Sequence, residues 1–195
     1  MMSSIVSFVE KYISVTDDDR KLLAEGQTLK RFQKKQEILV GSELNNFGLF
    51  LAEGICYLQK IDPDGNLKVL DFYFQGEPIL LVMDLSSEIE CYSLVALQDC
   101  AVMMSDARHV ESQMSKYPKF ERVCRIFAEE QLRKSKKIAE LLKLQDPAEK
   151  LNALMLWKPE ITQNIPKHLI ANFLGMRSET LSRVKSRLSE KFSEN

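Results

Sequence analysis

The residues whose types and spacing fit a chemical task lie near the end of the chain, between Ile165 and Leu188. Gly175 stands where one short helix must end and another begin, because glycine adopts a positive φ without a Cβ clash. The apolar residues on either side of it have the spacings of a shared seam between two helices. They are Ile170, Leu174, Leu181, Val184 and Leu188. The segment therefore predicts two short helices that meet at a tight corner.

The second of these helices leaves one side polar, with Ser178, Glu179 and Arg183 on it. Arg can hold guanine through two hydrogen bonds, Glu can accept one from the cytosine amino group, and short hydroxyl side chains allow close approach to phosphates. Glu179 and Arg183 are also four residues apart, which fits an ordinary intrahelical ion pair worth about 0.3–0.5 kcal/mol. The two roles are compatible, and the polar side suits a helix that reads the DNA major groove.

The charge distribution points to the same half of the chain. The net charge of −1 divides into −7 over residues 1–118, +4 over 119–145 and +2 over 146–195. A polyanion is drawn to the basic part of such a chain, although ordinary solvated helix faces carry similar charge. Charge alone therefore leaves both interpretations open.

The elements that must position this segment begin with strands. Short apolar segments separated by turn residues, among them the Asp-Pro-Asp-Gly run at 62–65, predict a jelly roll because their half-apolar faces must close on one another. The predicted strands lie at about 38–40, 47–52, 55–60, 67–74, 79–83, 91–97 and 101–104. Two short helices are expected before them, at 3–13 and 17–24, the second opened by Thr16.

After Pro118 the apolar period changes from two to between three and four, which predicts one helix through residue 144. At 1.5 Å per residue this helix is about 37 Å long, more than a small core can cover. Its apolar stripe fits packing on the β-module near one end and on a twin helix elsewhere. We expect a homodimer through this helix, with contacts from Phe120, Val123, Cys124, Phe127, Gln131, Ile138 and Leu141. Asp146 and Pro147 then open a small helical domain.

Composition and motifs exclude several classes of protein. With 45% hydrophobic residues the chain is predicted to be globular, and it lacks both a long apolar span and a basic, apolar leader. A cytoplasmic location without membrane contact is expected. No nucleophile and base pair, carboxylate constellation or phosphate loop suggests an enzyme, and two distant histidines give no metal site. The scattered cysteines fit a reducing compartment; they are Cys56, Cys91, Cys100 and Cys124.

From end to end the chain resembles the Crp/Fnr family of bacterial transcription regulators, most specifically in the run Gly-Met-Arg-Ser-Glu-Thr-Leu-Ser-Arg from Gly175 to Arg183. The resemblance implies an α+β fold with three parts. These are a β-roll sensor like a cyclic-nucleotide-binding domain over 1–118, a dimerisation helix over 119–145, and a winged-helix-like helix-turn-helix domain over 146–195. Any hairpin wing is expected before the recognition helix, around 158–165, because few residues follow that helix.

The resemblance places base contacts at Ser178, Glu179 and Arg183. Many members have an arginine where Ser178 stands, so we expect an altered operator preference. The expected partners are a second copy of the chain, a pseudo-palindromic double-stranded DNA and, further, RNA polymerase. The alternative is a sensor whose helical domain binds a protein. Phosphate contacts are expected from Lys167, Arg177, Thr180, Ser182, Lys185, Arg187 and Lys191.

The sensor lacks the residues that hold a cyclic nucleotide in relatives. Alignment puts two leucines at the Gly-Glu position and Glu90-Cys91 at the Arg-Ser position, where a carboxylate would repel a phosphate. We expect no response to cyclic AMP and no cofactor, since no cysteine precedes Cys56 to hold an iron–sulfur cluster. The sequence is compatible with an apolar effector or with no effector at all. An effector pocket, if used, is expected to be lined by Phe72, Phe74, Leu80, Leu81, Val82, Met83, Glu90 and Cys91.

Overall fold

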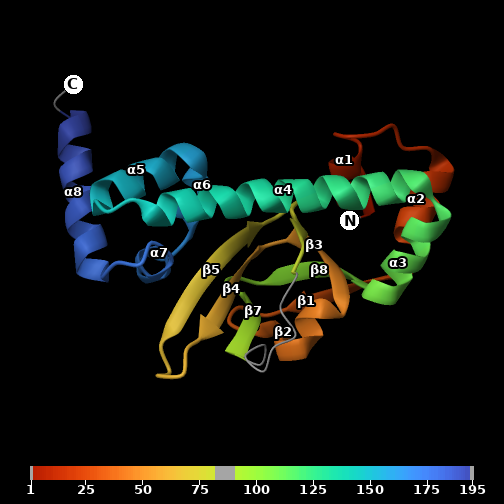
Figure 1. Ribbon diagram of the computed structural model, residues 1–195, viewed down its shortest axis with the longest axis horizontal. Helices are drawn as coiled ribbons and strands as arrows, with labels where there is room; N and C mark the ends of the chain where they lie inside the picture. Colours follow the sequence, from red (N-terminus) through yellow and green to blue (C-terminus); the bar gives the residue numbers. More distant parts are fainter. Residues whose placement is uncertain (1, 82–90, 194–195) are drawn as a thin grey trace.

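The computed structural model describes residues 2–81 and 91–193. Figure 1 shows one long helix, α4 (Pro118–Lys143), running along the molecule, with a β-roll beneath its middle. The N-terminal helices lie at one end of α4 and a group of short helices lies at the other. The predicted α+β architecture is confirmed, and so is a single helix over this region.

The β-roll consists of two four-stranded antiparallel sheets. The first has the order β1 (Gln27–Phe32), β8 (Cys100–Asp106), β3 (Phe47–Glu53) and β6 (Pro78–Ile79). The second has the order β2 (Glu37–Val40), β7 (Tyr92–Ala96), β4 (Ile55–Ile61) and β5 (Leu67–Phe74). A 3-10 helix, η1 (Gly41–Asn45), follows β2. The inner faces of both sheets close on one core that includes Leu51, Leu94 and Val102, because side chains alternate between the faces of each strand.

In the part of the chain up to Lys116, three elements were not expected, namely β1, η1 and the helix α3 (Ala107–Lys116). The predicted strand at 79–83 was too long within the described residues, since only its start belongs to β6, and residues 82–83 lie outside them.

Two N-terminal helices, α1 (Met2–Val9) and α2 (Asp17–Ala24), pack against the first half of α4. The first helix ends four residues earlier than expected. The second begins at a capping box in which Thr16 and Asp19 satisfy each other's backbone N–H groups. Three phenylalanine rings fix this end of the molecule. The ring of Phe8 meets Phe50 of β3 at 6.0 Å and Phe127 of α4 at 5.0 Å, both edge to face.

Four short helices follow α4, namely α5 (Pro147–Trp157), α6 (Pro159–Asn164), α7 (Lys167–Phe173) and α8 (Ser178–Ser193). The expected N-cap at Asp146 is confirmed, because its Oδ1 accepts from the N–H of Ala148 at 3.2 Å. The prediction that any hairpin wing lies around 158–165 was wrong. That stretch forms α6, with Ile161 buried against the other helices, since a proline at the first helical position favours a helix start.

Candidate nucleic-acid interface

The corner between α7 and α8 is built as its glycine predicts. Gly175 has a φ of +66°, and the N–H of Met176 reaches back to the carbonyl of Ala171 at 2.9 Å. This pairing satisfies a carbonyl that the helix end would otherwise leave without a partner. Lys150 of α5 also donates to the carbonyl of Leu174 at 3.1 Å. The corner from which α8 leaves is therefore held by hydrogen bonds to two backbone carbonyls, one donated by the backbone and one by a lysine side chain.

One side of α8 is held in the core of the helical domain. Leu181 and Val184 are buried with Ile170 and Leu174 of the preceding segment, and Leu188 packs against the same cluster. This confirms the seam that the spacing predicts. Burial of these side chains sets the rotation of α8 about its axis, and the rotation decides which residues face outward.

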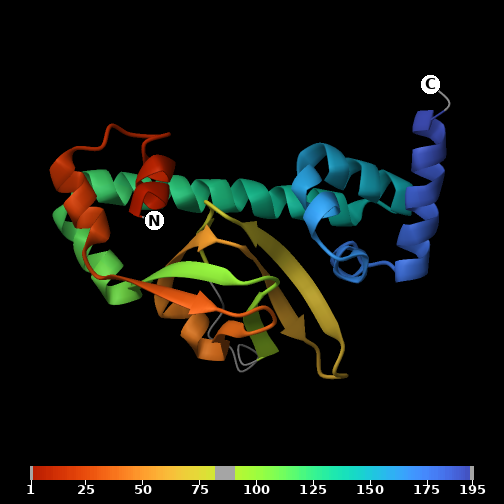
Figure 2. The same cartoon turned by 180° about the vertical axis from the view of Figure 1, so that it is seen from behind.

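The outward side of α8 carries the predicted base-contact residues. Ser178, Glu179 and Arg183 are all exposed, and α8 stands at the far end of the molecule, away from the β-roll (Figures 1 and 2). Among the described residues no salt bridge joins Glu179 to Arg183. Both charged groups therefore project without the intrahelical pairing that their spacing allows.

The predicted phosphate-contact residues lie on α7, on α8 and in the turn between them. Thr180 is half-buried, and Lys191 belongs to α8, although its side chain lies outside those described. The remaining members of the set are exposed, namely Lys167, Arg177, Ser182, Lys185 and Arg187. Among the described side chains of these two sets, hydroxyl, guanidinium and ammonium groups accompany the carboxylate of Glu179, a composition that suits the phosphate backbone of a nucleic acid.

The structure uses most of the predicted dimer residues of α4 within the chain. Val123 is buried against α1 and α2, and Leu141 is buried against the C-terminal helices. Phe120 and Phe127 pack against the first of these clusters and Ile138 against the second, while Gln131 and Cys124 are half-buried. The choice of Val123 and Leu141 as dimer contacts was therefore wrong, because their surface is already covered.

A different column of α4 is left uncovered. It alternates spacings of four and three residues, which is the period of a coiled-coil seam. Its members are all exposed and are Ala128, Leu132, Ser135, Ala139 and Leu142. We call this column the α4 seam.

The residues of the predicted effector pocket do not all share one face, because successive side chains of β5 point to opposite sides of the sheet. Phe72 and Phe74 lie on the outer face of the sheet, where Phe72 meets the ring of Phe173 of α7 at 5.3 Å. They contact the helical domain, so their assignment to the effector pocket was wrong. Leu81 is buried in the roll core, and Cys91 is half-buried with a free thiol. Val82, Met83 and Glu90 lie outside the described residues.

A cavity of about 560 Å³ lies between the inner face of the second sheet and α4. We call it the inner cavity. Asp71, Tyr73, Leu80 and Leu81 line it from the roll, and the α4 seam lines it from the helix. None of its described lining residues is basic, whereas a cyclic phosphate needs a cation.

The carboxylate beside the inner cavity is paired within the chain. The ammonium of Lys134 lies 2.8 Å from Oδ1 of Asp71, donates to the carbonyl of Phe72 at 2.9 Å, and sits 4.1 Å from the ring centroid of Tyr73. Both charged side chains are nearly buried, with 16% and 8% of their surface exposed. Burial raises the pKa of Tyr73 well above its ordinary value. Lys134 thus joins α4 to β5 through an ion pair, a hydrogen bond and a ring.

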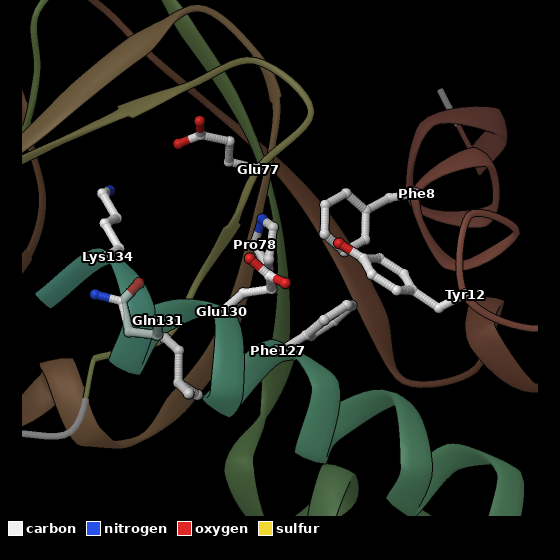
Figure 3. Close-up of a pocket in the computed structure, with 9 residues that line it drawn as sticks. Phe8, Tyr12, Glu77, Pro78, Phe127, Glu130, Gln131 and Lys134 are labelled. Atoms are coloured by element: carbon white, nitrogen blue, oxygen red, sulfur yellow. The ribbon is translucent and has the colours of Figure 1, made fainter. Parts of the chain in front are cut away.

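A smaller cavity of about 190 Å³ lies beside this contact (Figure 3). Lys134, Gln131 and Glu130 reach it from α4, and Glu77 faces it from the loop after β5. Glu77 is itself bound at 2.7 Å by Lys158, which precedes α6. Figure 3 shows Phe8, Tyr12 and Phe127 closing the other side. Through the ion pair between Glu77 and Lys158, the loop after β5 therefore connects the roll to the C-terminal helices.

A single amide fixes α7 to the edge of the second sheet. Asn172 accepts from the N–H of Val69 at 2.6 Å and donates to the carbonyl of Leu67 at 2.7 Å. The side chain thus pairs with the free edge of β5 as a neighbouring strand would. No signal in the sequence distinguishes this asparagine from one in a solvated helix, so the contact was not predicted.

Searches of family models and of curated proteins found no match. Solved structures do match. FixK2 from Bradyrhizobium japonicum superimposes with a TM-score of 0.73 at 19% identity, covering 85% of each chain. The chain has the Crp/Fnr fold.

Two further structures agree over most of their length. A transcriptional regulator assigned to the Crp/Fnr family, from Eubacterium rectale, has a TM-score of 0.68 at 15% identity over 91% of this chain and 85% of that one. The c-di-GMP-responsive global regulator CLP from Xanthomonas campestris has a TM-score of 0.65 at 13% identity over 88% and 90%. Among the described helices none is long and apolar enough to cross a membrane.

Proposed function

We propose that this chain is a dimeric, sequence-specific DNA-binding transcription regulator of the Crp/Fnr type. The observation that carries the proposal is the outward projection of Glu179 and Arg183 from a helix whose corner and rotation are both fixed. Neither group is paired within the described residues. On the recognition helix of a helix-turn-helix, such side chains reach base edges in the major groove. Ser178 completes the proposed base contacts.

A homodimer would form through the α4 seam. An exposed column with Leu132 and Leu142 and small residues between them allows two parallel helices to approach closely. Because the seam also lines the inner cavity, a second α4 laid on it would border that cavity as well. Two-fold symmetry then gives the dimer two recognition helices. The DNA that matches them is a pseudo-palindrome whose two half-sites lie about 34 Å apart, one turn of the double helix.

We further propose that the regulator does not respond to cyclic AMP. The inner cavity offers a carboxylate at Asp71 and no described cation, and the nearest ammonium, of Lys134, is already bound to that carboxylate. Transcription regulation, not catalysis, is the proposed role, in a cytoplasmic protein without a resident cofactor. The division at 1–118, 119–145 and 146–195 remains our proposal for the domains, and RNA polymerase remains a proposed partner.

Selection from random double-stranded DNA with the purified protein tests the proposal. We expect an enriched pseudo-palindrome, and Arg183→Ala should cost about 1–3 kcal/mol of binding and flatten preference at one position of each half-site. Lys185→Ala is the matched control, since loss of a phosphate contact weakens binding to all sequences alike and lowers the salt slope by about 1 for each site. If the protein shifts no DNA band in a gel-shift assay even at low salt, the result would favour the alternative, a helical domain that binds protein.

The seam has its own measurement. Leu132→Asp puts a charge into the proposed interface. We expect this variant to sediment as a monomer and, because a monomer carries one recognition helix, to lose binding to the full palindrome. Leu156→Asp is the control, because Leu156 is 87% exposed on α5 and, unlike the seam residues, does not line the inner cavity. Cyclic AMP and cyclic GMP should leave DNA affinity unchanged. A cyclic nucleotide that raises affinity would contradict the assignment of the inner cavity.

A further inference from the structure

The cavity of Figure 3, which we call the small cavity, has an aromatic side and a side with hydrogen-bond acceptors. Its volume is about 190 Å³, and an apolar cavity of about 150 Å³ is large enough to hold benzene. Three segments enclose it, namely α1 with the turn after it, the stretch 77–80, and the middle of α4. Every residue that lines it is half-buried, so a compact molecule can reach it from solvent.

The aromatic side consists of three rings in contact. The ring centroid of Phe8 lies 5.5 Å from that of Tyr12 and 5.0 Å from that of Phe127. Aromatic rings attract a cation to their faces through their quadrupole. The ammonium of Lys11 lies 5.3 Å from the centroid of the Phe8 ring, although Lys11 is exposed and does not line the cavity. This side therefore suits an organic cation with an apolar body.

The other side offers accessible acceptors. Figure 3 shows the carboxylate of Glu130 and the hydroxyl of Tyr12 pointing toward one another across the cavity. Burial raises the pKa of Tyr12, and the negative charge of Glu130 raises it further, which fits their proximity. The side chain of Glu130 is 45% exposed, and a carboxylate has more lone pairs than one ion pair uses. An N–H group in the cavity thus has acceptors to which it can donate.

The described ion pairs beside the small cavity leave one carboxylate in excess. In two of them each carboxylate has a cation of its own; these are Glu77 with Lys158 and Asp71 with Lys134. In the third, Arg133 contacts Glu130 and also lies 3.8 Å from Oε2 of Glu129, so one guanidinium serves two carboxylates. Lys134 is the cation that lines the cavity, and its ammonium is already bound to a carboxylate and to the carbonyl of Phe72. A cation that enters the cavity balances the excess charge.

We infer that the small cavity binds a compact primary ammonium ion, whose N–H groups donate to the carboxylate of Glu130 and the hydroxyl of Tyr12 while its apolar body packs against Phe8 and Phe127. Small alkylamines and arylalkylamines have this chemistry, since an amine of this kind is protonated at neutral pH, as the lysine side chain is. A quaternary ammonium ion lacks the N–H donors, and an anion would meet the excess carboxylate. The bound ion would contact α1, α4 and the stretch 77–80 at once.

Two probes of the same shape test this inference. Full-length protein is titrated with benzylammonium and with benzyl alcohol, without DNA, so the outcome does not depend on the proposed function. We expect benzylammonium to bind about tenfold more tightly, because hydrogen bonds between charged groups are about twice as strong as neutral ones. Glu130→Gln removes the charge at nearly constant shape and should lose most of this preference. Glu129→Gln is the matched control and should keep it, because Glu129 shares Arg133 but does not line the cavity.

The position of the probe is read from the ring resonances of the tyrosines. Tyr12 lines the small cavity, so its resonance, assigned by its loss in Tyr12→Phe, should shift with benzylammonium. Tyr117 is the internal control, because it is 45% exposed and does not line the cavity. Equal affinities of the two probes in the unchanged protein, an undiminished preference in Glu130→Gln, an equal loss of preference in Glu129→Gln, or a Tyr12 resonance that does not move would each overturn the inference.

Discussion

Loss of one partner of the ion pair between Lys134 and Asp71 is expected to destabilise the protein strongly. Lys134→Met removes the ammonium but keeps the length of the side chain, and it leaves a carboxylate that is only 8% exposed without its cation. Removal of one partner of a buried pair costs about 3–5 kcal/mol. We expect the lower end, about 3 kcal/mol, because the Lys134 side chain keeps 16% of its surface in water. For a chain of this size that corresponds to roughly 6–12 °C in Tm.

A double-mutant cycle separates the pair from its surroundings. Asp71→Asn alone leaves a buried ammonium and should also be destabilising, whereas the variant that combines the two substitutions leaves no unpaired charge. We expect urea unfolding to show a coupling energy of at least about 3 kcal/mol, with the double variant more stable than either single one. Simple additivity of the two single losses would refute the view that the pair holds α4 to the roll.

Three further predictions rest on single residues. The backbone N–H of Thr16 holds the pKa of Asp19 down to about 2, so the capping box stabilises the protein above about pH 4 and this contribution disappears as pH falls toward 2. In urea unfolding at pH 5.5, 4 and 3, Asp19→Asn should be less sensitive to pH, and an equal slope would contradict this. Asn172→Ala removes the acceptor of the Val69 N–H, and hydrogen exchange at that amide should rise about tenfold; an unchanged rate would show that α7 is held otherwise. Gly175→Ala places a Cβ at a φ of +66° and should lower the free energy of unfolding by about 1–2 kcal/mol without changing the helix content.

The parts of the fold that were predictable are those where one local signal decides the outcome. The corner at Gly175 needs a residue that tolerates positive φ, and the sequence supplies one between two apolar seams. The caps at Thr16 and Asp146 form as their residue types predict. In each case the interacting groups lie within a few residues of one another, so no knowledge of the tertiary structure is needed.

Errors occurred where two surfaces compete for apolar residues. In β5 both faces are covered, so Phe72 and Tyr73 are equally apolar and nothing in the sequence shows which one points into the roll. In α4 apolar residues lie on several sides, and its period does not say which side meets a second chain. The edge strand β1 was missed for the opposite reason. Its residues are mostly exposed, and pairing with β8 rather than burial holds it in place.

The contacts around Lys134 form one continuous connection from α4 to α8, the proposed recognition helix. Its ammonium binds the carbonyl of Phe72, the ring of Phe72 packs on Phe173 of α7, and α7 ends at the corner from which α8 leaves. Every step is a direct contact between packed groups, so the chain of contacts from α4 to α8 is unbroken. Energetic coupling along this connection is a separate property from contact. DNA affinity measured for Lys134→Met and Asp71→Asn, singly and together, determines whether the two ends are coupled, since uncoupled ends would leave affinity unchanged while stability falls.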